Sequence, residues 1–431
     1  MAFYIVETKE QLNTLPKKPN CFIDLITKSE EAHPILTTPS VLYYNNFEKG
    51  FIFVIDHSEG FSLDLKDIQE FLSQHDKVYL VDGKFHSYYL NLPNKIDLRF
   101  EVIDKEGIDL DCYTAVHRDF HRRLQYNQAV NTLVPISKHY EKSECVFETL
   151  RNLIGLETNV EWQNKFTEAY KWVEEQGLNI SEKIFDKYFE PTWKSNSVSS
   201  NKIYTSYNLY NMTSRPTNAY NGLNFLALPK DKSRAAFLPS NDKFIEFDFD
   251  GYHLRLIANM LNLKIPIEES IHTHLGKHYF KKEALSDEEY QESKKITFRQ
   301  LYSHVEKQYL HIELFKHVEE LISAMWKEYQ RVGFLRLPNG RNITQENTNS
   351  QKLFNYYVQC LETVNNTKKL LKLKKALEYK KSKIVLVVYD SILVDFALED
   401  GRETLDEIRA ILQEDGYLVK IKTGNSYNFE Q

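Results

Sequence analysis

The sequence predicts a multidomain protein of α/β and α+β class. Three observations lead to this prediction. The chain has 431 residues, enough for two or three domains of ordinary size. Strand-like and helix-like runs alternate over roughly the first 110 residues, whereas residues 137–189 have a helical pattern. From about residue 203 onward, strand and helix patterns are mixed.

Composition and charge exclude several classes of protein. Hydrophobic residues make up 42% and charged residues 27%, as in chains that bury a sizeable core. No uncharged apolar run approaches the roughly 18 residues that span a bilayer, so we expect no membrane partner. The net charge of −6 excludes a uniformly basic nucleic-acid binder but not a locally basic one. The four cysteines form no CxxC pair and the first residues lack a secretory pattern, so we expect a cytoplasmic protein.

The first region fits an α/β unit. Residues 65–73 carry apolar side chains at helical spacing. The β-rich runs around this helix are residues 3–7, 21–27, 41–44, 50–56 and 77–81. Further on, residues 166–177 (FTEAYKWVEEQG) indicate a helix that Gly177 ends. The polar residues 194–202 (KSNSVSSNK) indicate a loop or linker.

A strand with three carboxylates is predicted at residues 244–250 (FIEFDFD). Its residues alternate strictly, which places Glu246, Asp248 and Asp250 on one face and apolar residues on the other. After Gly251 the apolar residues recur at helical spacing, so the strand runs directly into an amphipathic helix. Taken alone, the segment is better explained as an edge strand with a solvated acidic face.

A hairpin with an aspartate at its tip is predicted at residues 384–396 (IVLVVYDSILVDF), where two β-branched runs flank Tyr389, Asp390 and Ser391. Taken alone, a turn aspartate usually hydrogen-bonds its own backbone. Together with Asp248 it is more informative, because two aspartates on adjacent strands repel each other unless a divalent cation neutralises them. Mg²⁺ prefers one or two carboxylates plus substrate phosphates. Two such ions activate an attacking hydroxyl and stabilise a leaving pyrophosphate.

A helix between these strands carries a possible nucleotide-binding face. In residues 292–305 (ESKKITFRQLYSHV), Lys294, Phe298 and Tyr302 recur every four residues and share one side of the helix. A lysine and two rings, each one turn apart, can hold a triphosphate at one end and a base or sugar at the other. For the helix in isolation, a buried aromatic stripe with a snorkelling lysine is the better explanation.

In order and spacing, the three segments resemble motifs A, B and C of family A DNA polymerases, the bacterial polymerase I type. Residues 248–255 (DFDGYHLR) resemble the motif A pattern D-Y-S-x-x-E-L-R. The fingers-helix pattern K-x₃-F-x₃-Y is matched by Lys294, Phe298 and Tyr302, and residues 389–391 (YDS) take the H-D-E position of motif C. The resemblance covers about residues 200–431.

Weaker matches follow the family order around these motifs. They are Thr213-Ser214-Arg215 for the T-G-R that touches the duplex, Ile271-His272 for the fingers histidine that contacts incoming phosphates, Leu337-x₂-Gly340-Arg341 for T-x₂-G-R, and Asn355-x₃-Gln359 for the N-x₃-Q that reads the minor groove.

The resemblance implies a DNA-directed DNA polymerase that extends a primer by two-metal-ion nucleotidyl transfer, with primer-template DNA and dNTPs as partners. It implies two Mg²⁺ ions, replaceable by Mn²⁺, on the catalytic Asp248 and Asp390 and on the backbone carbonyl of Phe249. The implied nucleotide-binding residues are Lys294, Phe298, Tyr302, His253 and His272. The implied DNA-binding residues are Arg215, Asn355, Gln359 and Tyr389.

Four residues depart from the family pattern. The sugar-gating glutamate of motif A is His253, which leaves sugar selectivity open, and the glutamate of motif C is Ser391. The arginine four residues before the fingers lysine is Tyr290, which weakens the implied phosphate site. Ser303 stands where a glycine usually follows the fingers tyrosine.

The start of the chain resembles an RNase H-like 3′–5′ exonuclease-type domain. The matches are residues 4–15 (YIVETKEQLNTL) for its first strand and helix, 21–26 (CFIDLI) for its D-x-E strand and 81–90 (VDGKFHSYYL) for its N-x-K-F-D segment. Asp24 is present, but Ile26 and His86 replace two carboxylates. A two-metal nuclease cannot hold its ions with these losses, so we predict no proofreading activity.

Residues 169–189 resemble the opening of the family thumb, but only about 35 residues separate Gly177 from Thr213, far fewer than in relatives. We therefore expect a reduced thumb and weak processivity, compensated by a processivity partner or self-association. The implied domains are residues 1–125 (degenerate exonuclease-like domain), 126–200 (reduced thumb and helical linker) and 201–431 (palm and fingers, the fingers at about 262–335).

Other interpretations stay open. An RNA polymerase or primase-like enzyme on the same palm is compatible with His253, and a non-catalytic DNA-binding scaffold is a further alternative. Histidines 272, 274 and 278 raise the question of zinc, but only the last two have the spacing to face one ligand. The lysine-rich residues 368–383 predict an amphipathic helix whose basic face either tracks phosphates or is merely solvated. The sequence is compatible with a role in replication and with a role in repair. Its small size would suit a protein of a phage or mobile element, and we would then expect it in bacterial or phage-infected host cytoplasm.

Overall fold

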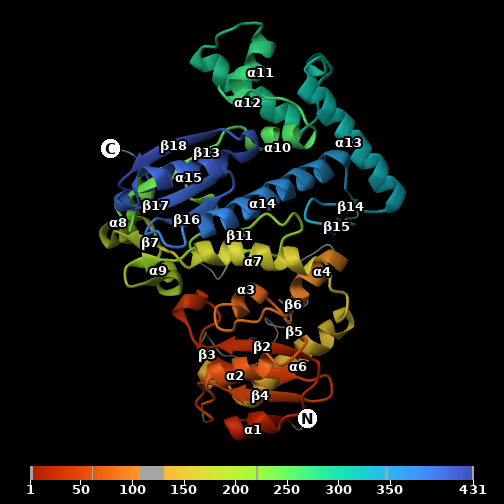
Figure 1. Ribbon diagram of the computed structural model, residues 1–431, viewed down its shortest axis with the longest axis vertical. Coiled ribbons are helices and arrows are strands. Elements are labelled where there is room, and N and C mark those ends of the chain that lie inside the picture. Colours follow the sequence, from red (N-terminus) through yellow and green to blue (C-terminus); the bar gives the residue numbers. More distant parts are fainter. Residues whose placement is uncertain (1–2, 61, 107–130, 220–221, 345–347, 430–431) are drawn as a thin grey trace. The chain divides into compact units, whose positions relative to one another are not determined.

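The computed structural model describes residues 3–60, 62–106, 131–219, 222–344 and 348–429. The chain forms two compact units (Figure 1). Unit 1 comprises Met1–Lys171, Glu190–Asn211 and Asn218–Leu223, and unit 2 comprises Trp172–Phe189, Met212–Thr217 and Asn224–Gln431. The three-part division at residues 125 and 200 stays a prediction, and its first boundary lies outside the described residues. Among the helices that can be described, none is long and apolar enough to cross a membrane.

Unit 1 is built on a six-stranded mixed sheet in the order β1-β4-β3-β2-β5-β6. Its strands are β1 (Tyr4–Val6), β2 (Asn20–Thr27), β3 (Pro39–Asn45), β4 (Gly50–Val54), β5 (Lys77–Leu80) and β6 (Lys95–Asp97). Strands β2, β5 and β6 run parallel, whereas β3 is antiparallel to β2 and β4. Both faces of the sheet are buried, because alternate residues of β2 enter two different apolar clusters. The strands and the helix α2 (Leu65–Leu72) confirm the pattern predicted for this region.

The other elements of unit 1 are mainly helices. They are α1 (Lys9–Thr14), α3 (Gly83–His86), α4 (Leu98–Glu106), α6 (Ile136–Leu150), most of α7 (Val160–Glu174), α9 (Pro191–Ser197) and the short strands β8 (Val198–Ser199), β9 (Lys202–Ile203) and β10 (Tyr207–Asn208). The loop predicted at residues 194–202 is wrong over most of its length, because α9 extends to Ser197 and β8 and β9 form a hairpin. Ser200 and Asn201 both have positive φ, which is the geometry of a two-residue hairpin turn. Polar residues are common both in such turns and in longer loops, so composition alone did not distinguish the two.

Unit 2 contains an antiparallel sheet in the order β16-β17-β13-β18 (Figure 1). Its strands are β13 (Lys243–Phe249), β16 (Lys383–Val388), β17 (Ser391–Phe396) and β18 (Val419–Gly424). The helix α14 (Ser350–Ala376) contacts α10 (Tyr252–Met260) and α15 (Gly401–Gln413), and α15 contacts β18. The predicted carboxylate strand, the helix after it and the hairpin are therefore confirmed. The helix predicted at residues 368–383 is wrong in its second half, since α14 ends at Ala376 and β16 begins at Lys383.

The remaining elements of unit 2 include a helical region. The helix α11 (Ile271–Phe280) packs on α12 (Asp287–Tyr302), and α13 (Glu313–Val332) contacts α14. A capping box formed by Ser286 and Glu289 starts α12 and so fixes the register of the helix that carries Lys294. The other elements are α8 (Glu182–Tyr188) and the strands β7 (Leu178–Ile180), β12 (Phe237–Leu238), β14 (Leu335–Arg336) and β15 (Asn342–Ile343). The two-residue strand β11 (Thr217–Asn218) lies where the chain passes between the units.

Candidate functional site

The three carboxylates of the β13 segment have different surroundings. Glu246 is buried and accepts hydrogen bonds from Ser391 Oγ and Lys422 Nζ, both at 3.1 Å. Asp250 is buried too, and it accepts from the backbone amide of Ile271 at 2.8 Å and from Ser270 Oγ at 2.7 Å. Asp248, which lies between them, has no hydrogen-bond or ion-pair partner among the described residues. The solvated acidic face is therefore wrong, and one carboxylate of the three is left for a ligand.

The turn that carries Asp390 is held in place by neighbouring elements. Asp248 is paired with Ser391 across β13 and β17, and the amide of Phe249 donates to the carbonyl oxygen of Asp390 at 2.9 Å. Tyr389 has a φ of 55°, which a tight turn imposes. The amide group of Asn366 on α14 donates to the carbonyl oxygen of Tyr389 at 2.9 Å. These contacts fix the backbone of the turn, while the Asp390 carboxylate has no side-chain partner within the described ranges.

Glycine at position 251 is a steric requirement of the same site. Gly251 precedes α10 with a φ of 55°, and a Cβ at this position would lie 2.0 Å from Cγ2 of Ile271. A side chain here would push Ile271 away from Asp250, whose carboxylate accepts the hydrogen bond from the Ile271 amide. The glycine thus allows β13, α10 and α11 to meet closely.

The electrostatic state of the two aspartates favours a cation. Burial, followed by the charge of Glu246, raises the pKa of Asp248. The carboxylate of Asp390 stays accessible to water, yet the packed protein around it and the charge of Asp248 raise its pKa to about 6. Asp250 shows the opposite result, because Lys420 and the donors around it lower its pKa despite burial. Asp248 and Asp390 are the pair whose negative charge the protein leaves uncompensated.

The donor set fits Mg²⁺ better than zinc. Mg²⁺ is commonly held by one or two carboxylates, with substrate phosphates and water completing its shell. A structural zinc site needs three or four protein ligands, and the part of the chain that can be described contains no group of three or more His, Cys, Asp or Glu side chains placed to hold a metal. His274 pairs with Glu269, and its ring lies 5.3 Å from that of His278.

Both aspartates line a pocket of about 370 Å³ within unit 2. The five predicted nucleotide-binding residues line it as well: Lys294, Phe298, Tyr302, His253 and His272. The rings of Phe298 and Tyr302 stack at 6.1 Å and are 46% and 38% exposed. The buried aromatic stripe is therefore wrong, because these rings leave flat surface on which a base can stack.

His272 offers an unused polar atom at the pocket. Its ring is buried and lies 5.4 Å from Phe298, and its Nδ1 has no hydrogen-bond partner among the described residues. Burial lowers its pKa to about 4, and the charges of Lys294 and Lys420 act in the same direction. The imidazole is neutral at neutral pH and can still donate one hydrogen bond to a phosphate oxygen.

Lys420 and Lys230 line the pocket but were not predicted from the sequence. Lys420 Nζ lies 2.6 Å from Asp250 and 3.2 Å from the hydroxyl of Tyr290, and Lys294 Nζ lies 4.6 Å from the centre of the Tyr290 ring. Tyr290 therefore stands between two lysines. Lys420 on β18 places a positive charge beside Tyr290, the position at which the family pattern has an arginine. Alternating lysines in that strand (VKIKTG) were the only sequence signal for it.

The predicted DNA-binding residues fall into two groups. The guanidinium of Arg215 lies 3.9 Å from the centre of the Tyr389 ring, and Arg215 also lines the pocket. Asn355 and Gln359 lie one turn apart on α14 but are not among the residues that line the pocket. Oδ1 of Asn355 is buried and has no partner among the described residues. The site therefore brings Arg215 and Tyr389 together with the aspartates but not the other pair.

Two weak sequence matches meet in space. Ser214, from the T-G-R-like segment, accepts hydrogen bonds from Arg341 Nη1 and Asn339 Nδ2, both at 2.8 Å. Residues 337–341 are the segment compared with T-x₂-G-R. This contact holds the turn that leads to Arg215, in which Ser214 has a φ of 60°.

The fold of this chain is similar to that of a known polymerase domain. No family model and no curated protein matches the chain. Among solved structures, the chain is similar to the POL domain of Pol1 from M. smegmatis, in complex with DNA primer-template and dNTP. The TM-score is 0.69 with 13% sequence identity, over 95% of this chain and 96% of that chain. The chain has a polymerase-like fold. An exonuclease-type domain in unit 1 stays a prediction, as do the roles of the site residues.

The residues compared with a nuclease site in unit 1 are engaged in internal contacts. Asp24 is buried on β2 and accepts a hydrogen bond from Ser143 Oγ at 2.6 Å. His86 Nε2 accepts from the amide of Leu25 at 3.1 Å, so its Nδ1 carries the proton and donates to the carbonyl oxygen of Asp82 at 3.0 Å. Burial lowers the pKa of His86, which agrees with this neutral form. Neither nitrogen is left to bind a metal.

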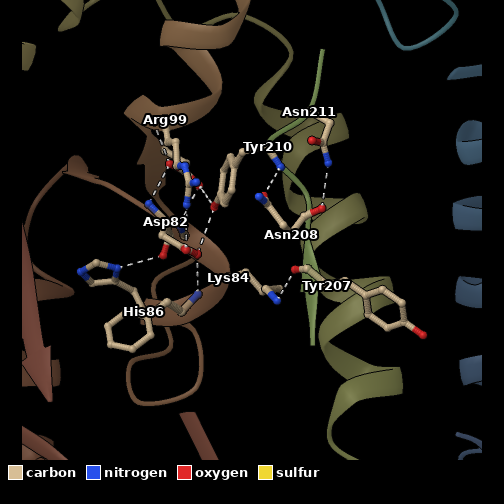
Figure 2. A network of polar contacts seen from close by, with 11 residues as sticks. Asp82, Lys84, His86, Arg99, Tyr207, Asn208, Tyr210 and Asn211 are labelled. Atoms are coloured by element: carbon tan, nitrogen blue, oxygen red, sulfur yellow. Dashed lines mark hydrogen bonds and ion pairs between the residues drawn. The ribbon is translucent and has the colours of Figure 1, made fainter. Parts of the chain in front are cut away.

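A network of polar contacts connects the region around α3 with residues 207–211 (Figure 2). The hydroxyl of Tyr210 donates to Asp97 at 2.6 Å and lies 3.1 Å from Asp82. The buried Lys84 donates to the carbonyl oxygen of Tyr207 at 2.6 Å. Figure 2 shows Lys84 and Tyr210 approaching each other's segments from opposite sides. Lys84 of α3, Asp82 before it and Asp97 of β6 thus contact residues 207–210 of the same unit.

Proposed function

We propose that this chain is a DNA-directed DNA polymerase that extends a primer with dNTPs. The observation that carries the proposal is the pair of carboxylates on Asp248 and Asp390. Asp248 lies on β13 and Asp390 lies in the turn between β16 and β17. Both have no side-chain partners among the described residues, and both line the same pocket as three lysines and two stacked rings. The fold likeness to a polymerase domain supports the proposal.

Asp248 and Asp390, with the backbone carbonyl of Phe249, would hold two Mg²⁺ ions, and Mn²⁺ suits the same oxygen donors. When bound, the ions would acidify the primer hydroxyl and neutralise charge on the leaving pyrophosphate. In the reaction, the primer 3′ hydroxyl gives its proton to water, and its oxygen forms a bond to the α-phosphorus of the dNTP. The bond from that phosphorus to the bridging oxygen of the pyrophosphate breaks, and pyrophosphate leaves with the electron pair.

The chain's own residues would bind and orient the two substrates. Lys294 and Lys420 would neutralise the triphosphate, and the neutral His272 would donate a hydrogen bond to it. Phe298 and Tyr302 would stack on the base and border the sugar. Arg215, with its guanidinium over Tyr389, would contact the primer end, where its positive charge favours a phosphate.

Primer extension on a recessed template with Mg²⁺ tests the proposal. We expect templated dNTP addition by the wild type and its loss in Asp248→Ala and in Asp390→Ala. Equal or faster addition of ribonucleotides would instead favour an RNA polymerase or primase-like enzyme on the same palm. Binding of primer-template without any extension would favour the scaffold interpretation.

We also propose that unit 1 is an RNase H-like exonuclease-type domain without nuclease activity. Its mixed sheet supports the first part, and the internal hydrogen bonds of His86 and Asp24 support the second. The purified protein should leave a 3′ single strand intact in Mg²⁺ and in Mn²⁺. Degradation that Asp24→Ala abolishes would contradict this proposal.

Weak processivity is the third part of the proposal, and it rests on the short stretch between Gly177 and Thr213. With an unlabelled DNA trap added at the start, extension should stop after few nucleotides. A processivity partner or self-association would lengthen the products. Long products from single binding events, at a concentration where the protein is monomeric, would show that no such partner is needed.

A further inference from the structure

A buried carboxylate in the pocket has no role in the proposed mechanism. Glu362 lies on α14, three residues after Gln359, is 2% exposed, and lines the pocket. Its two oxygens accept hydrogen bonds from Nε and Nη2 of Arg215, both at 3.2 Å. One of them also lies 2.5 Å from Nε2 of His253. Burying a carboxylate costs desolvation free energy, which the hydrogen bonds from Arg215 and His253 offset here.

The contact with His253 continues to the fingers helix. Nδ1 of His253 lies 2.6 Å from the hydroxyl oxygen of Tyr302, and the two rings meet edge to face at 5.9 Å. Glu362, His253 and Tyr302 therefore form a chain of hydrogen bonds from α14 through α10 to α12. Only 10% of the His253 side chain is exposed, so its ring is held between the other two groups.

The two end groups of this chain of hydrogen bonds have shifted pKa values. Burial alone would raise the pKa of Glu362, but the contacts with His253 and Arg215 outweigh it and lower the pKa. Glu362 is thus an ionised acceptor, and Nε2 of His253 carries the proton it receives. Burial and the charge of Glu362 raise the pKa of Tyr302, so its hydroxyl stays protonated and shares a hydrogen bond with Nδ1 of His253.

We propose that Glu362 is a positioning residue that gives this site its preference for deoxyribose over ribose. The inference rests on the proposed polymerase function. Through His253, Glu362 fixes the rings of His253 and Tyr302 that border the sugar site. Both nitrogens of His253 are occupied, so a 2′-hydroxyl pressed against this ring loses its water and gains no hydrogen bond from it. The methylene group of a deoxyribose loses nothing there.

The same carboxylate joins the nucleotide residues to the primer-end residues. Glu362 holds Arg215, whose guanidinium lies over the ring of Tyr389. Glu362 therefore contacts residues of both the nucleotide site and the primer-end site. If the contact with His253 selects the sugar, loss of Glu362 should reduce the preference for dNTPs over ribonucleotides more than it reduces the rate of dNTP addition.

The test compares kcat/KM for dATP and ATP opposite template T, in the wild type, in Glu362→Gln and in His253→Ala. We expect the wild type to prefer dATP, and the preference to fall by about tenfold or more in both variants, because each loses a packed, hydrogen-bonded side of the sugar site. The gain should appear as a lower KM for ATP, whereas a merely destabilised protein would lose kcat for both nucleotides.

Two further variants separate positioning from folding. Glu101→Gln removes a buried carboxylate of unit 1 that accepts from Thr158 and Gln163, and it should leave the dATP preference unchanged. The double variant His253→Glu/Glu362→Gln moves the carboxylate from α14 to α10 without opposing two negative charges. It should recover most of the preference, whereas His253→Glu alone places two carboxylates together and should not.

An unchanged preference in Glu362→Gln and His253→Ala, with dATP addition intact, would overturn the inference and leave the polymerase proposal standing. Equal use of dATP and ATP by the wild type would overturn it as well. If the wild type adds no nucleotide at all, the polymerase proposal fails instead. Equilibrium binding of dATP and ATP to the protein with primer-template then tests the inference. If the ratio of the two affinities is the same in the wild type and in Glu362→Gln, the inference is contradicted.

Discussion

The backbone amide of Phe249 donates to the carbonyl oxygen of Asp390 at 2.9 Å. This bond joins the end of β13 to the tip of the β16–β17 hairpin. Asp248 immediately precedes the donor, so both aspartates are fixed at one pocket by the backbone rather than by contacts of their own carboxylates. A folded protein that holds two acids together in this way has a stability that depends on what neutralises them.

Replacing Asp390 with asparagine should stabilise the metal-free protein, because it removes a carboxylate that repels Asp248. We expect a gain of about 1 kcal/mol in the free energy of unfolding, allowing for solvent screening at this accessible group. Mg²⁺ should raise the melting temperature of the wild type but not that of the variant. Thermal unfolding in EDTA and in Mg²⁺ measures both effects.

Asp395→Asn is the matched control on the same hairpin. Its carboxylate accepts from the amides of Ser240 and Asn241 at 2.7 and 2.9 Å, so asparagine should destabilise here. A variant Asp390→Asn that melts below the wild type in EDTA would show that Asp390 has a structural partner after all.

Lys294→Ala should raise the KM for dNTPs about tenfold to a hundredfold, because the lost ammonium removes a charge from the triphosphate site. The neighbouring Lys295 offers a control of equal chemistry. Its side chain is 76% exposed and pairs with Glu292, and it is not among the pocket residues. Steady-state kinetics of Lys295→Ala should match the wild type, and similar losses in both variants would argue against a phosphate site on this helix face.

Lys420→Ala should weaken dNTP binding and also destabilise the fold, since it leaves the buried Asp250 without its 2.6 Å ion pair. Because the Lys420 side chain is 48% exposed, solvent screening reduces the cost of a lost buried pair, and we expect a loss of roughly 1–2 kcal/mol. Lys420→Arg keeps the charge and should recover stability and most of the dNTP affinity. Urea unfolding with steady-state kinetics distinguishes the two effects. Normal dNTP affinity in a folded Lys420→Ala would remove Lys420 from the phosphate site.

Asp97 should make unit 1 less stable as the pH rises. Burial, followed by the charge of Asp82, raises the pKa of Asp97 to about 6, above its value in the unfolded chain. Below about pH 4 the group is protonated in both states and contributes nothing, whereas above about pH 6 the folded state carries an unfavourable charge. The contribution amounts to roughly 2–3 kcal/mol.

Urea unfolding of the wild type and of Asp97→Asn at pH 4.5 and pH 7 isolates this contribution. Asparagine loses an acceptor for the Gly83 amide and the Tyr210 hydroxyl, so the variant should be the less stable protein at pH 4.5. Its disadvantage should shrink at pH 7, where the wild type carries the charge. A disadvantage that grows with pH would mean that the ionised form of Asp97 is the favoured one.

The sequence predicted those parts of the site that lie within single segments. Strict alternation in β13 and the helical spacing of Lys294, Phe298 and Tyr302 are local properties, and the structure follows both. The two aspartates were paired by family order, and the sheet brings them together. The solvated acidic face was wrong because burial of Glu246 and Asp250 depends on partners that come from other elements.

The residues that were missed depend on tertiary contacts. Lys420 reaches the pocket only because β18 pairs with β13, and a lysine in an edge strand has no pattern of its own. Glu362 belongs to no family motif that was matched, and its one local signal is a charge within a helix face that is otherwise buried around it. The hydrogen bond between His253 and Glu362 forms only because α10 and α14 pack together, and spacing along the chain does not reveal that packing.

The central claim is that Asp248 and Asp390 catalyse templated nucleotide addition. Single-nucleotide incorporation tests it most directly, with each of the four dNTPs offered opposite each of the four template bases in Mg²⁺. We predict that the wild type adds the complementary nucleotide in each case, and that Asp248→Asn and Asp390→Asn bind the primer-template but add none. Addition that ignores the template base, or that persists in either variant, would contradict the account.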